Sequence, residues 1–336
     1  MLSRAFTKPK KSPKNGDQSD GGGSKSGFIL ESEDCMVGFM DDLPVIVCGQ
    51  GESRVGLREI LRSSVGVMGE SPLGMTEKVV LLQGKVYALK RFRRTIVRRK
   101  EFARRVERLA MVSGRCEYLV PVTAYLYTKR IKFVVCDYHP MGSLADLLAG
   151  EREFGHTALV WNQRLIIALS IAQAISFIHT RCPPYDKKMQ MNVHGNIKAS
   201  NVMININFTA CLSDYGFTQL AEFEKVSDTG QRKPASNAKT DYCNELNQKS
   251  DIFNFGVILL DMLGGSEAPG LRDCIEASKE IIKEGNIEFF EFPVEGHERK
   301  QALQVLDIAL ACTSKVPVAR PSIEKILRAL GDVIIK

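Results

Sequence analysis

Residues 192–217 read NVHGNIKASNVMININFTACLSDYGF, and this stretch decides the fold. Two apolar pieces, Val202–Ile206 and Ala210–Leu212, lie within it. The polar residues on either side are of types that hold phosphate groups and metal ions in proteins. They are His194, Asn196, Lys198 and Asn201 before the apolar pieces, and Asp214 thirteen residues after Asn201.

This spacing resembles the centre of a protein kinase, where a loop H-R-D-L-K-x-x-N precedes a short hairpin and a metal-binding D-F-G. Here the two phrases are His194–Asn201 (HGNIKASN) and Asp214–Gly216 (DYG). In detail the chain resembles plant leucine-rich-repeat receptor-like kinases, whose loops often read H-G-x-I-K-x-S-N. The resemblance implies an α+β, bilobal protein-kinase-like fold. Its small β-rich N-lobe would carry one main helix, and its larger C-lobe would be mostly α-helical.

The catalytic loop departs from the family at the position that matters most for catalysis. Asn196 stands where the family has the catalytic Asp, and losing general-base assistance costs ~10²–10⁴-fold in rate. Gly195 replaces the Arg that in the family pairs with a phosphorylated activation segment. By resemblance, Lys198 would meet the γ-phosphate, and Asn201 with Asp214 would hold Mg²⁺. The sequence therefore predicts a catalytic loop in which the catalytic residue is substituted and the metal ligands are retained.

The nucleotide-binding strands precede this loop. Residues 69–74 (GESPLG) resemble the G-x-G-x-x-G loop, with Gly69 and Gly74 retained. Ser71 holds the middle position, and Pro72 removes a backbone donor at the tip. Residues 87–90 (YALK) resemble the V-A-I-K strand, which would place Lys90 on the α/β-phosphates. A lone Lys after a strand is usually a solvated strand end, but this context favours the phosphate role.

The resemblance also supplies an adenine site. The residues that it implies there are Thr76 and Ala88 above the ring, Met203 below it, Cys136 as gatekeeper behind it, and Tyr138 in the hinge phrase DYHPMGSL. We expect ATP to bind weakly and with Mg²⁺, because the glycine loop is altered and Lys90 lacks a clear acidic partner.

In the family, that partner is a Glu on the helix that follows the lysine strand. Phe102, Val106 and Leu109 share one face at i, i+4 and i+7, which predicts a helix of about three turns. Counting from Phe102 puts Arg105 at the Glu position, whereas counting back from Leu119 and Val120 gives Glu107. The spacing of the apolar residues on this helix favours Arg105, and Glu107 stays open as the alternative. Nine basic residues lie between Lys90 and Arg105, a pattern that more often marks a solvated face than a docking site.

Further phrases predict the remaining elements. We expect strands over 44–48 and 131–136, and helices over 56–62 and 161–180. Lys249-Ser250-Asp251 resembles the family's K-S-D, whose Asp holds the catalytic-loop backbone; capping of a helix by Ser250 or Asp251 is the plainer interpretation. Arg320 would pair with a Glu that closes the activation segment, for which Glu245 is the candidate.

The composition of the chain limits the other classes of protein to which it can belong. With 336 residues and a net charge of +7, the chain is long enough for a two-lobed domain and too weakly basic to indicate nucleic acid. Its nine cysteines include no C-x-x-C pair, which favours reduced thiols. Residues 1–40 have the composition of a disordered basic Gly/Ser tail. We expect the kinase-like domain over 41–334, with lobes 41–136 and 137–334.

Three functions compete. The favoured one is an inactive receptor-like Ser/Thr kinase domain, or pseudokinase, that acts as a scaffold or allosteric partner of other receptor kinases or signalling proteins. The second is a low-activity Ser/Thr kinase. The third is a basic surface binder of anionic membrane or nucleic acid, although no nucleic-acid motif accompanies the charge. We expect a cytoplasmic location, and contact of the N-terminal tail with the inner face of the plasma membrane.

Overall fold

The computed structural model describes residues 45–48, 57–154, 159–186, 188–221, 246–264, 275, 277–285 and 289–335. They belong to one compact unit, which spans Asp42–Lys336. The predicted tail lies outside the described residues, and the predicted domain and lobe boundaries stay predictions. No helix among the described residues is long and apolar enough to cross a membrane.

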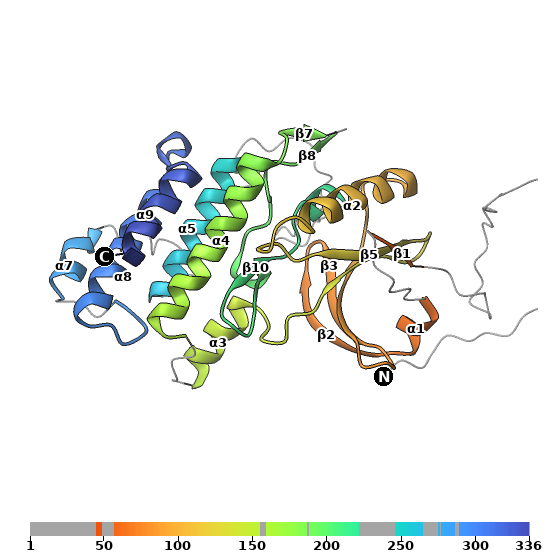
Figure 1. Cartoon of the computed structure of the whole chain (residues 1–336), viewed down its shortest axis with the longest axis horizontal. Coiled ribbons are helices and arrows are strands. Elements are labelled where there is room, and N and C mark those ends of the chain that lie inside the picture. Colours follow the sequence, from red (N-terminus) through yellow and green to blue (C-terminus); the bar gives the residue numbers. More distant parts are fainter. Residues whose placement is uncertain are drawn as a thin grey trace, which may run out of the picture. The chain divides into compact units, whose positions relative to one another are not determined.

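A six-stranded antiparallel sheet forms the first part of the unit (Figure 1), with the strand order β1-β5-β6-β4-β3-β2. Its strands are β1 Ile46–Val47, β2 Ser64–Ser71, β3 Gly74–Val80, β4 Val86–Phe92, β5 Val122–Tyr127 and β6 Lys132–Asp137. A cluster that includes Val79, Leu89 and Phe133 is buried on one side of the sheet, together with Ile60 of helix α1 (Leu57–Arg62). Strand β6 and helix α1 confirm the elements predicted over 131–136 and 56–62 to within two residues.

Helix α2 (Arg99–Ser113) packs against β5. Phe102, Val106 and Leu109 are all buried, so the predicted apolar face is confirmed. The Phe102 ring meets Phe92 edge-on, with the two ring centroids 5.8 Å apart. These contacts fix the rotation of α2, and therefore decide which of its polar residues face the rest of the molecule.

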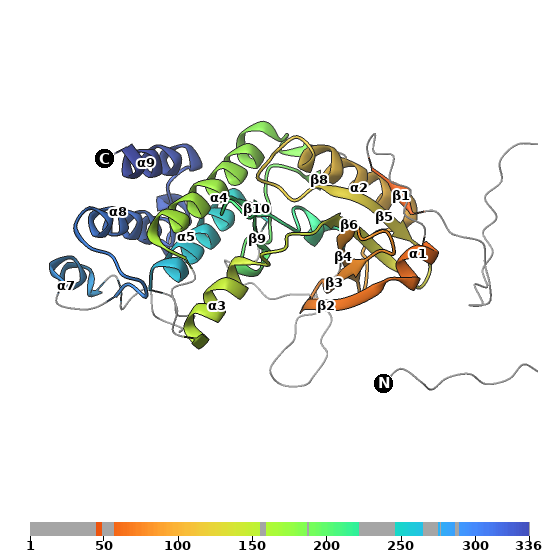
Figure 2. The ribbon, with the colours of Figure 1, turned by 60° about the horizontal axis from the view of Figure 1, so that its bottom comes forward.

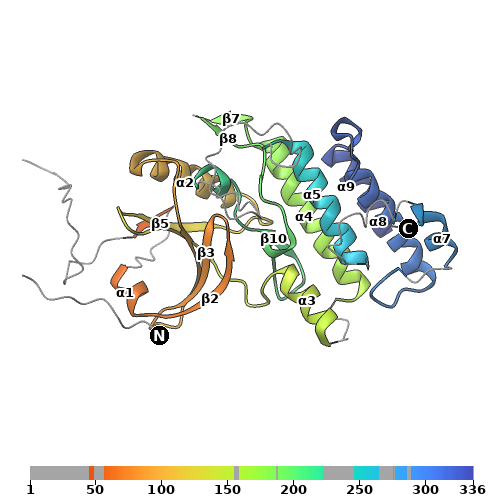
Figure 3. The same cartoon turned by 180° about the vertical axis from the view of Figure 1, so that it is seen from behind.

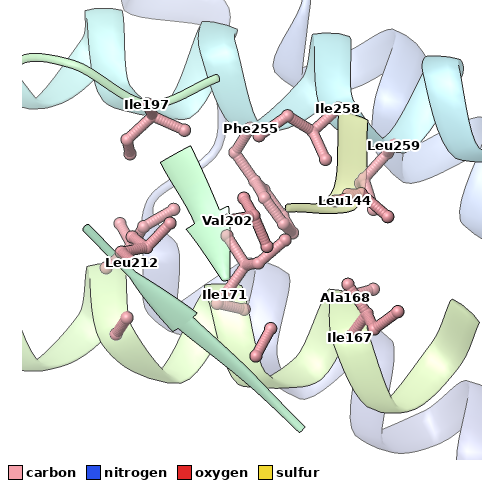
Figure 4. Close-up of a cluster of buried hydrophobic side chains, with 14 of the residues drawn as sticks. Leu144, Ile167, Ala168, Ile171, Ile197, Val202, Leu212, Phe255, Ile258 and Leu259 are labelled. Carbon is pink, nitrogen blue, oxygen red and sulfur yellow. The ribbon is translucent and has the colours of Figure 1, made fainter. Parts of the chain in front are cut away.

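The second part is mostly helical (Figures 2 and 3) and gives the α+β class that the sequence predicted. Its helices are α3 Leu144–Phe154, α4 Trp161–Arg181, α5 Gln248–Gly264, α7 Lys279–Glu284, α8 Gly296–Cys312 and α9 Ile323–Ile335. Helix α4 contacts α5, α9 and β10, and its apolar residues are buried around its circumference, as expected for a central helix. Figure 4 shows Ile171 of α4 and Phe255 of α5 gathered around Val202.

Short elements connect the helices. They are the hairpin β7 Tyr185–Asp186 with β8 Met189–Gln190, the hairpin β9 Val202–Ile204 with β10 Ala210–Leu212, and the 3₁₀ turns η1 Ala199–Asn201, η2 Phe217–Gln219 and η3 Pro317–Ala319. Because Val202 and Leu212 are buried between the helices, the residues at both ends of the second hairpin are held by the core. Those ends carry the polar residues singled out in the sequence.

Candidate functional site

The loop that begins at His194 is held from α5. The carboxylate of Asp251, which is fully buried, accepts hydrogen bonds from the backbone N–H groups of His194 (2.8 Å) and Gly195 (3.0 Å). Asp251 thus contacts the catalytic-loop backbone in the way the K-S-D resemblance implied. The plainer interpretation needs a correction: the Asn247 side chain caps the first turn, since its Oδ1 accepts from Ser250 N–H at 2.7 Å.

The backbone also brings Asn196, Asn201 and Asp214 into one neighbourhood. Asn201 Nδ2 donates to the Asn196 carbonyl oxygen at 2.8 Å. The N–H of Ser213, the residue before Asp214, donates to the Asn201 carbonyl oxygen at 2.8 Å. The two hydrogen bonds therefore link Asn196 to Asn201, and Asn201 to the residue directly before Asp214.

Gly195 is required by its surroundings. Its φ of +75° lies in the left-handed region, and a Cβ there would come within 2.3 Å of the Leu246 side chain. A larger residue would have to displace Leu246 and accept a strained backbone. The packing around position 195 therefore leaves no room for a side chain such as Arg.

Lys90 is the most strongly engaged residue of the site. Its Nζ lies 2.9 Å from Asp214 Oδ2, in an ion pair whose side chains are only 7% and 10% exposed. The same ammonium donates to Thr76 Oγ1 at 3.2 Å and to Ser71 Oγ at 3.4 Å. Two hydrogen bonds and one ion pair therefore hold the ammonium among three side-chain oxygens.

Helix α2 gives Lys90 no carboxylate. Arg105 donates from Nε to Glu101 at 2.8 Å and from Nη1 to the Gln219 carbonyl oxygen at 2.6 Å. Glu107 instead accepts from the Tyr125 hydroxyl at 2.9 Å. Of the two residues left open by the sequence, Arg105 is therefore the one that faces the segment after Asp214.

Gln219 joins a second element to this contact. Its side chain accepts from Gln190 N–H and donates to the Gln190 carbonyl oxygen, both at 2.8 Å, and so extends the hairpin β7–β8. Arg108 of α2 reaches the same hairpin through Asp186 at 2.7 Å. Sequence reasoning missed Gln219 and Asp186, because neither belongs to a motif and both act through distant partners.

Some predicted adenine-site residues are brought together by sheet register. Thr76 pairs with Lys90, and Ala88 pairs with Cys136 on the neighbouring strand. Met203 lies on β9, bridged to Ser143. The Tyr138 ring lies under Lys78, whose Nζ is 4.6 Å from the ring centroid. The adenine roles of these residues stay predictions.

The predicted glycine loop also has packing roles, and the nucleotide-binding roles of Gly69 and Gly74 stay predictions. Gly74 has φ +148°, and a Cβ there would lie 1.9 Å from the Arg91 carbonyl oxygen, so this glycine serves strand packing. Gly69 is exposed, beside a bulge that follows Val67, and has no such neighbour. Leu73 at the tip is only 2% exposed and belongs to the main core. The tip is thus anchored in the protein interior.

The electrostatics follow from this crowding. Burial lowers the pKa of Lys198, the nearby Asp214 carboxylate opposes that effect, and Lys90 adds to it. One carboxylate thus shares its field with two ammonium groups. Asn201 and Asp214 have the oxygen donors that Mg²⁺ prefers, but an ion at Asp214 would compete with Lys90. The described residues contain no cluster of three or more His, Cys, Asp or Glu that could hold a metal.

Arg320 lies in a different environment. It donates to the carbonyl oxygens of Ser314 and Lys249, both at 2.9 Å, and its guanidinium stacks over Phe253 at 4.7 Å. These contacts tie the segment before α9 to α5. Its predicted partner Glu245 and most of the predicted activation segment lie outside the described residues.

Comparisons with known proteins agree with this geometry. The chain is 31% identical over 290 residues to a probable inactive receptor kinase of Arabidopsis thaliana, covering 82% of this chain and 44% of that protein. It is also 31% identical over 294 residues to an inactive leucine-rich repeat receptor-like serine/threonine-protein kinase of the same plant, covering 83% and 42%. The chain therefore spans less than half the length of these relatives.

Solved structures share the fold. The pseudokinase domain of BIR2, described as an immune regulator of the RLK/Pelle family, matches with a TM-score of 0.70 at 23% identity over 87% of this chain and 90% of that one. The maize SIRK1 kinase domain bound to AMP-PNP matches with a TM-score of 0.66 at 23% identity, over 85% and 98%. The family model of protein tyrosine and serine/threonine kinases matches residues 72–330. The chain belongs to this kinase family and is related to the plant leucine-rich-repeat receptor-like kinases.

Proposed function

We propose that this chain is a pseudokinase domain, which has lost efficient phosphoryl transfer and acts as a scaffold or allosteric partner of other receptor kinases or signalling proteins. The observation that carries the proposal is that the Lys90 ammonium is already bound by side chains of the protein. This ammonium forms a buried ion pair with Asp214 and donates hydrogen bonds to Thr76 and Ser71. A phosphate group would have to replace oxygens that are already in place.

Two further residues support the loss of catalysis. Asn196 stands at the position where the resemblance puts the catalytic base, and a neutral amide cannot accept the substrate's hydroxyl proton effectively. Arg105 sets a cation at the α2 position where Lys90 needs an anion, and it is held there by Glu101 and Gln219. The protein thus keeps α2 in place without a Lys–Glu ion pair.

Nucleotide binding belongs to the same proposal as a weak property. If ATP binds, Lys90 would hold phosphate oxygens, and Asn201 with Asp214 would hold Mg²⁺, which neutralises phosphate charge. The donor types fit the metal, but the phosphate side fits only in part, since the loop tip is anchored by Leu73. We expect binding in the tens of micromolar or weaker, about −6 kcal/mol.

A low-activity Ser/Thr kinase is the second candidate. It is favoured by the grouping of Lys198, Asn201 and Asp214 in one neighbourhood. Phosphoryl transfer depends mainly on positioning and electrostatics, so a site that keeps these groups can retain some rate without the base.

A phosphotransfer assay separates the two candidates. Purified protein with radiolabelled ATP and Mg²⁺ or Mn²⁺ should transfer little phosphate to itself or to a generic substrate. Robust transfer that Lys90→Met abolishes would establish the kinase and overturn the pseudokinase. The variant Asn196→Asp is informative as well. Strong activity in this variant would show that Asn196 alone accounts for the loss, and that the Lys90 contacts do not block nucleotide.

A further inference from the structure

The charge of this protein is concentrated in one short segment. Residues 91–108 contain nine basic and two acidic residues, a net charge of +7 that equals the formal net charge of the whole 336-residue chain. Residues 1–40, with six basic and five acidic residues, are close to neutral by comparison. The most strongly basic stretch of the described residues therefore lies just before and within the start of α2.

Part of that charge is neutralised inside the domain. Arg91 pairs with Glu77, Arg93 with Glu70, and Arg108 with Asp186. Arg98, Arg99 and Lys100 are exposed, and the described part of the chain offers them no ion-pair partner. These three cations are therefore available to a partner outside the chain.

An exposed aliphatic residue lies beside them. Ile96 is 57% exposed, in a loop where Arg93 and Arg94 precede it and Arg98 follows it. The loop backbone is fixed, because Ile96 N–H donates to the Leu220 carbonyl oxygen at 3.1 Å and Thr95 forms a bridge with Ala221. We call residues 93–100, which combine these cations with Ile96, the basic segment.

We propose that the basic segment docks this domain on an anionic lipid surface. Exposed cations around an aliphatic side chain suit a bilayer interface, where charged headgroups cover an apolar boundary. A phosphorylated peptide would be recognised by arginines that converge on one phosphate group. Arg98 instead is the extended N-cap residue of α2, and Arg99 and Lys100 are the first two residues of the helix, where side chains point about 100° apart. Spread cations match a surface of many headgroups better than a single phosphate.

Vesicle co-sedimentation of the full chain tests the proposal. The protein should bind phosphatidylcholine vesicles that contain phosphatidylserine and should dissociate from them at high salt. It should not bind vesicles of pure phosphatidylcholine. Arg98→Glu with Arg99→Glu should weaken binding about tenfold or more, because each basic residue near an anionic surface contributes. Ile96→Ser should weaken it less. The matched control is Lys129→Glu with Arg130→Glu, an exposed pair in the β5–β6 turn whose reversal changes the net charge equally.

Three results would overturn the proposal. The first is no binding to phosphatidylserine vesicles, even if an acidic phosphopeptide is bound. The second is equal weakening by both charge-reversal pairs, which would mean that only net charge matters. The third is loss of binding when Lys8, Lys10, Lys11 and Lys14 are changed to Gln, since the N-terminal tail would then be the anchor. The variants at positions 96, 98, 99, 129 and 130 should melt at the wild-type temperature, because these side chains are exposed.

Discussion

Arg105 contacts two parts of the chain at once. Its guanidinium is anchored by Glu101 one turn earlier, and it donates to the Gln219 carbonyl oxygen, 114 residues later in the chain. Its side chain is only 12% exposed, so both contacts are shielded from water. The family resemblance implies a Glu at this position, which would pair with Lys90. In this protein the residue at that position binds α2 to the 217–219 turn.

Arg105→Glu should consequently shift the protein toward nucleotide binding. We expect a lower melting temperature without ligand, since a contact of about 1–2 kcal/mol is lost and Glu101 gains a like-charged neighbour at i+4. We also expect a larger stabilisation by Mg-ATP, because a second carboxylate competes for Lys90 and releases Asp214 for the metal. Differential scanning fluorimetry with and without millimolar Mg-ATP measures both effects.

Arg104→Glu is the matched control for this prediction. Arg104 pairs with the same Glu101 but is 45% exposed, so its reversal removes an ion pair without placing a carboxylate toward Lys90. An equal or smaller Mg-ATP shift in Arg105→Glu than in Arg104→Glu would contradict our assignment of Arg105 to the Lys90 side of α2.

At the scale of elements, the pairing of β3 with β4 explains why Gly74 has no side chain. Gly74→Ala should destabilise the fold by about 3 kcal/mol or more, because its Cβ would collide with the Arg91 carbonyl oxygen and its φ of +148° disfavours a side chain. Gly66→Ala on the edge strand β2 meets nothing within 4 Å and should change stability by less than about 1 kcal/mol. Urea denaturation compares the two. Similar effects of both substitutions would show that Gly74 is not needed for packing.

The link between α5 and the loop at His194 also belongs to this scale. Asp251→Asn keeps the shape of the side chain but replaces one accepting oxygen by a donor, which would face a backbone N–H. We expect a loss of about 2–4 kcal/mol in the free energy of unfolding. Asp307→Asn serves as the control, since Asp307 is 47% exposed and pairs with Lys279 at the surface, where such pairs contribute about 0–1 kcal/mol. Equal losses in equilibrium denaturation would rule out a special role for Asp251.

For the whole molecule, acidification should reduce stability. Burial lowers the pKa of His194 below its ordinary value of 6.5, although the Asp251 carboxylate opposes the effect. The native state therefore binds fewer protons than the unfolded state. The stabilisation is complete above pH 6.5 and is lost as the pH falls through the lowered native value, by up to about 1.4 kcal/mol at pH 5.5.

Urea unfolding at pH 7.5 and 5.5 measures this change. The pKa of His139 is lowered in the same direction by burial, and the raised pKa of Asp137 acts against it at lower pH. His194→Gln should lower stability at pH 7.5 and flatten the difference between the two conditions. Two results would show that His194 does not cause the pH dependence. One is a wild-type protein that is as stable at pH 5.5 as at 7.5, and the other is an unchanged stability difference between these pH values in His194→Gln.

The sequence alone determined what depends on local order and spacing. The interval between Asn201 and Asp214 identified the kinase fold, and the apolar spacing of Phe102, Val106 and Leu109 set the buried face of α2, because periodicity and motif spacing are local properties. The resemblance placed Asp251 on the loop backbone correctly. The nucleotide role that the motif gives Gly74 stays a prediction, and the structure adds its close packing against the Arg91 backbone.

Only the tertiary structure decided the partners of the polar groups. The sequence left Arg105 and Glu107 open, and the folded structure shows that Lys90 pairs with Asp214. These contacts join residues more than one hundred positions apart, and each depends on how the sheet and the helical part pack. Hydrogen bonds and ion pairs require distances near 3 Å, which no local pattern specifies. The burial of Leu73 in the main core follows from the same packing, and so the state of the site is a property of the folded molecule.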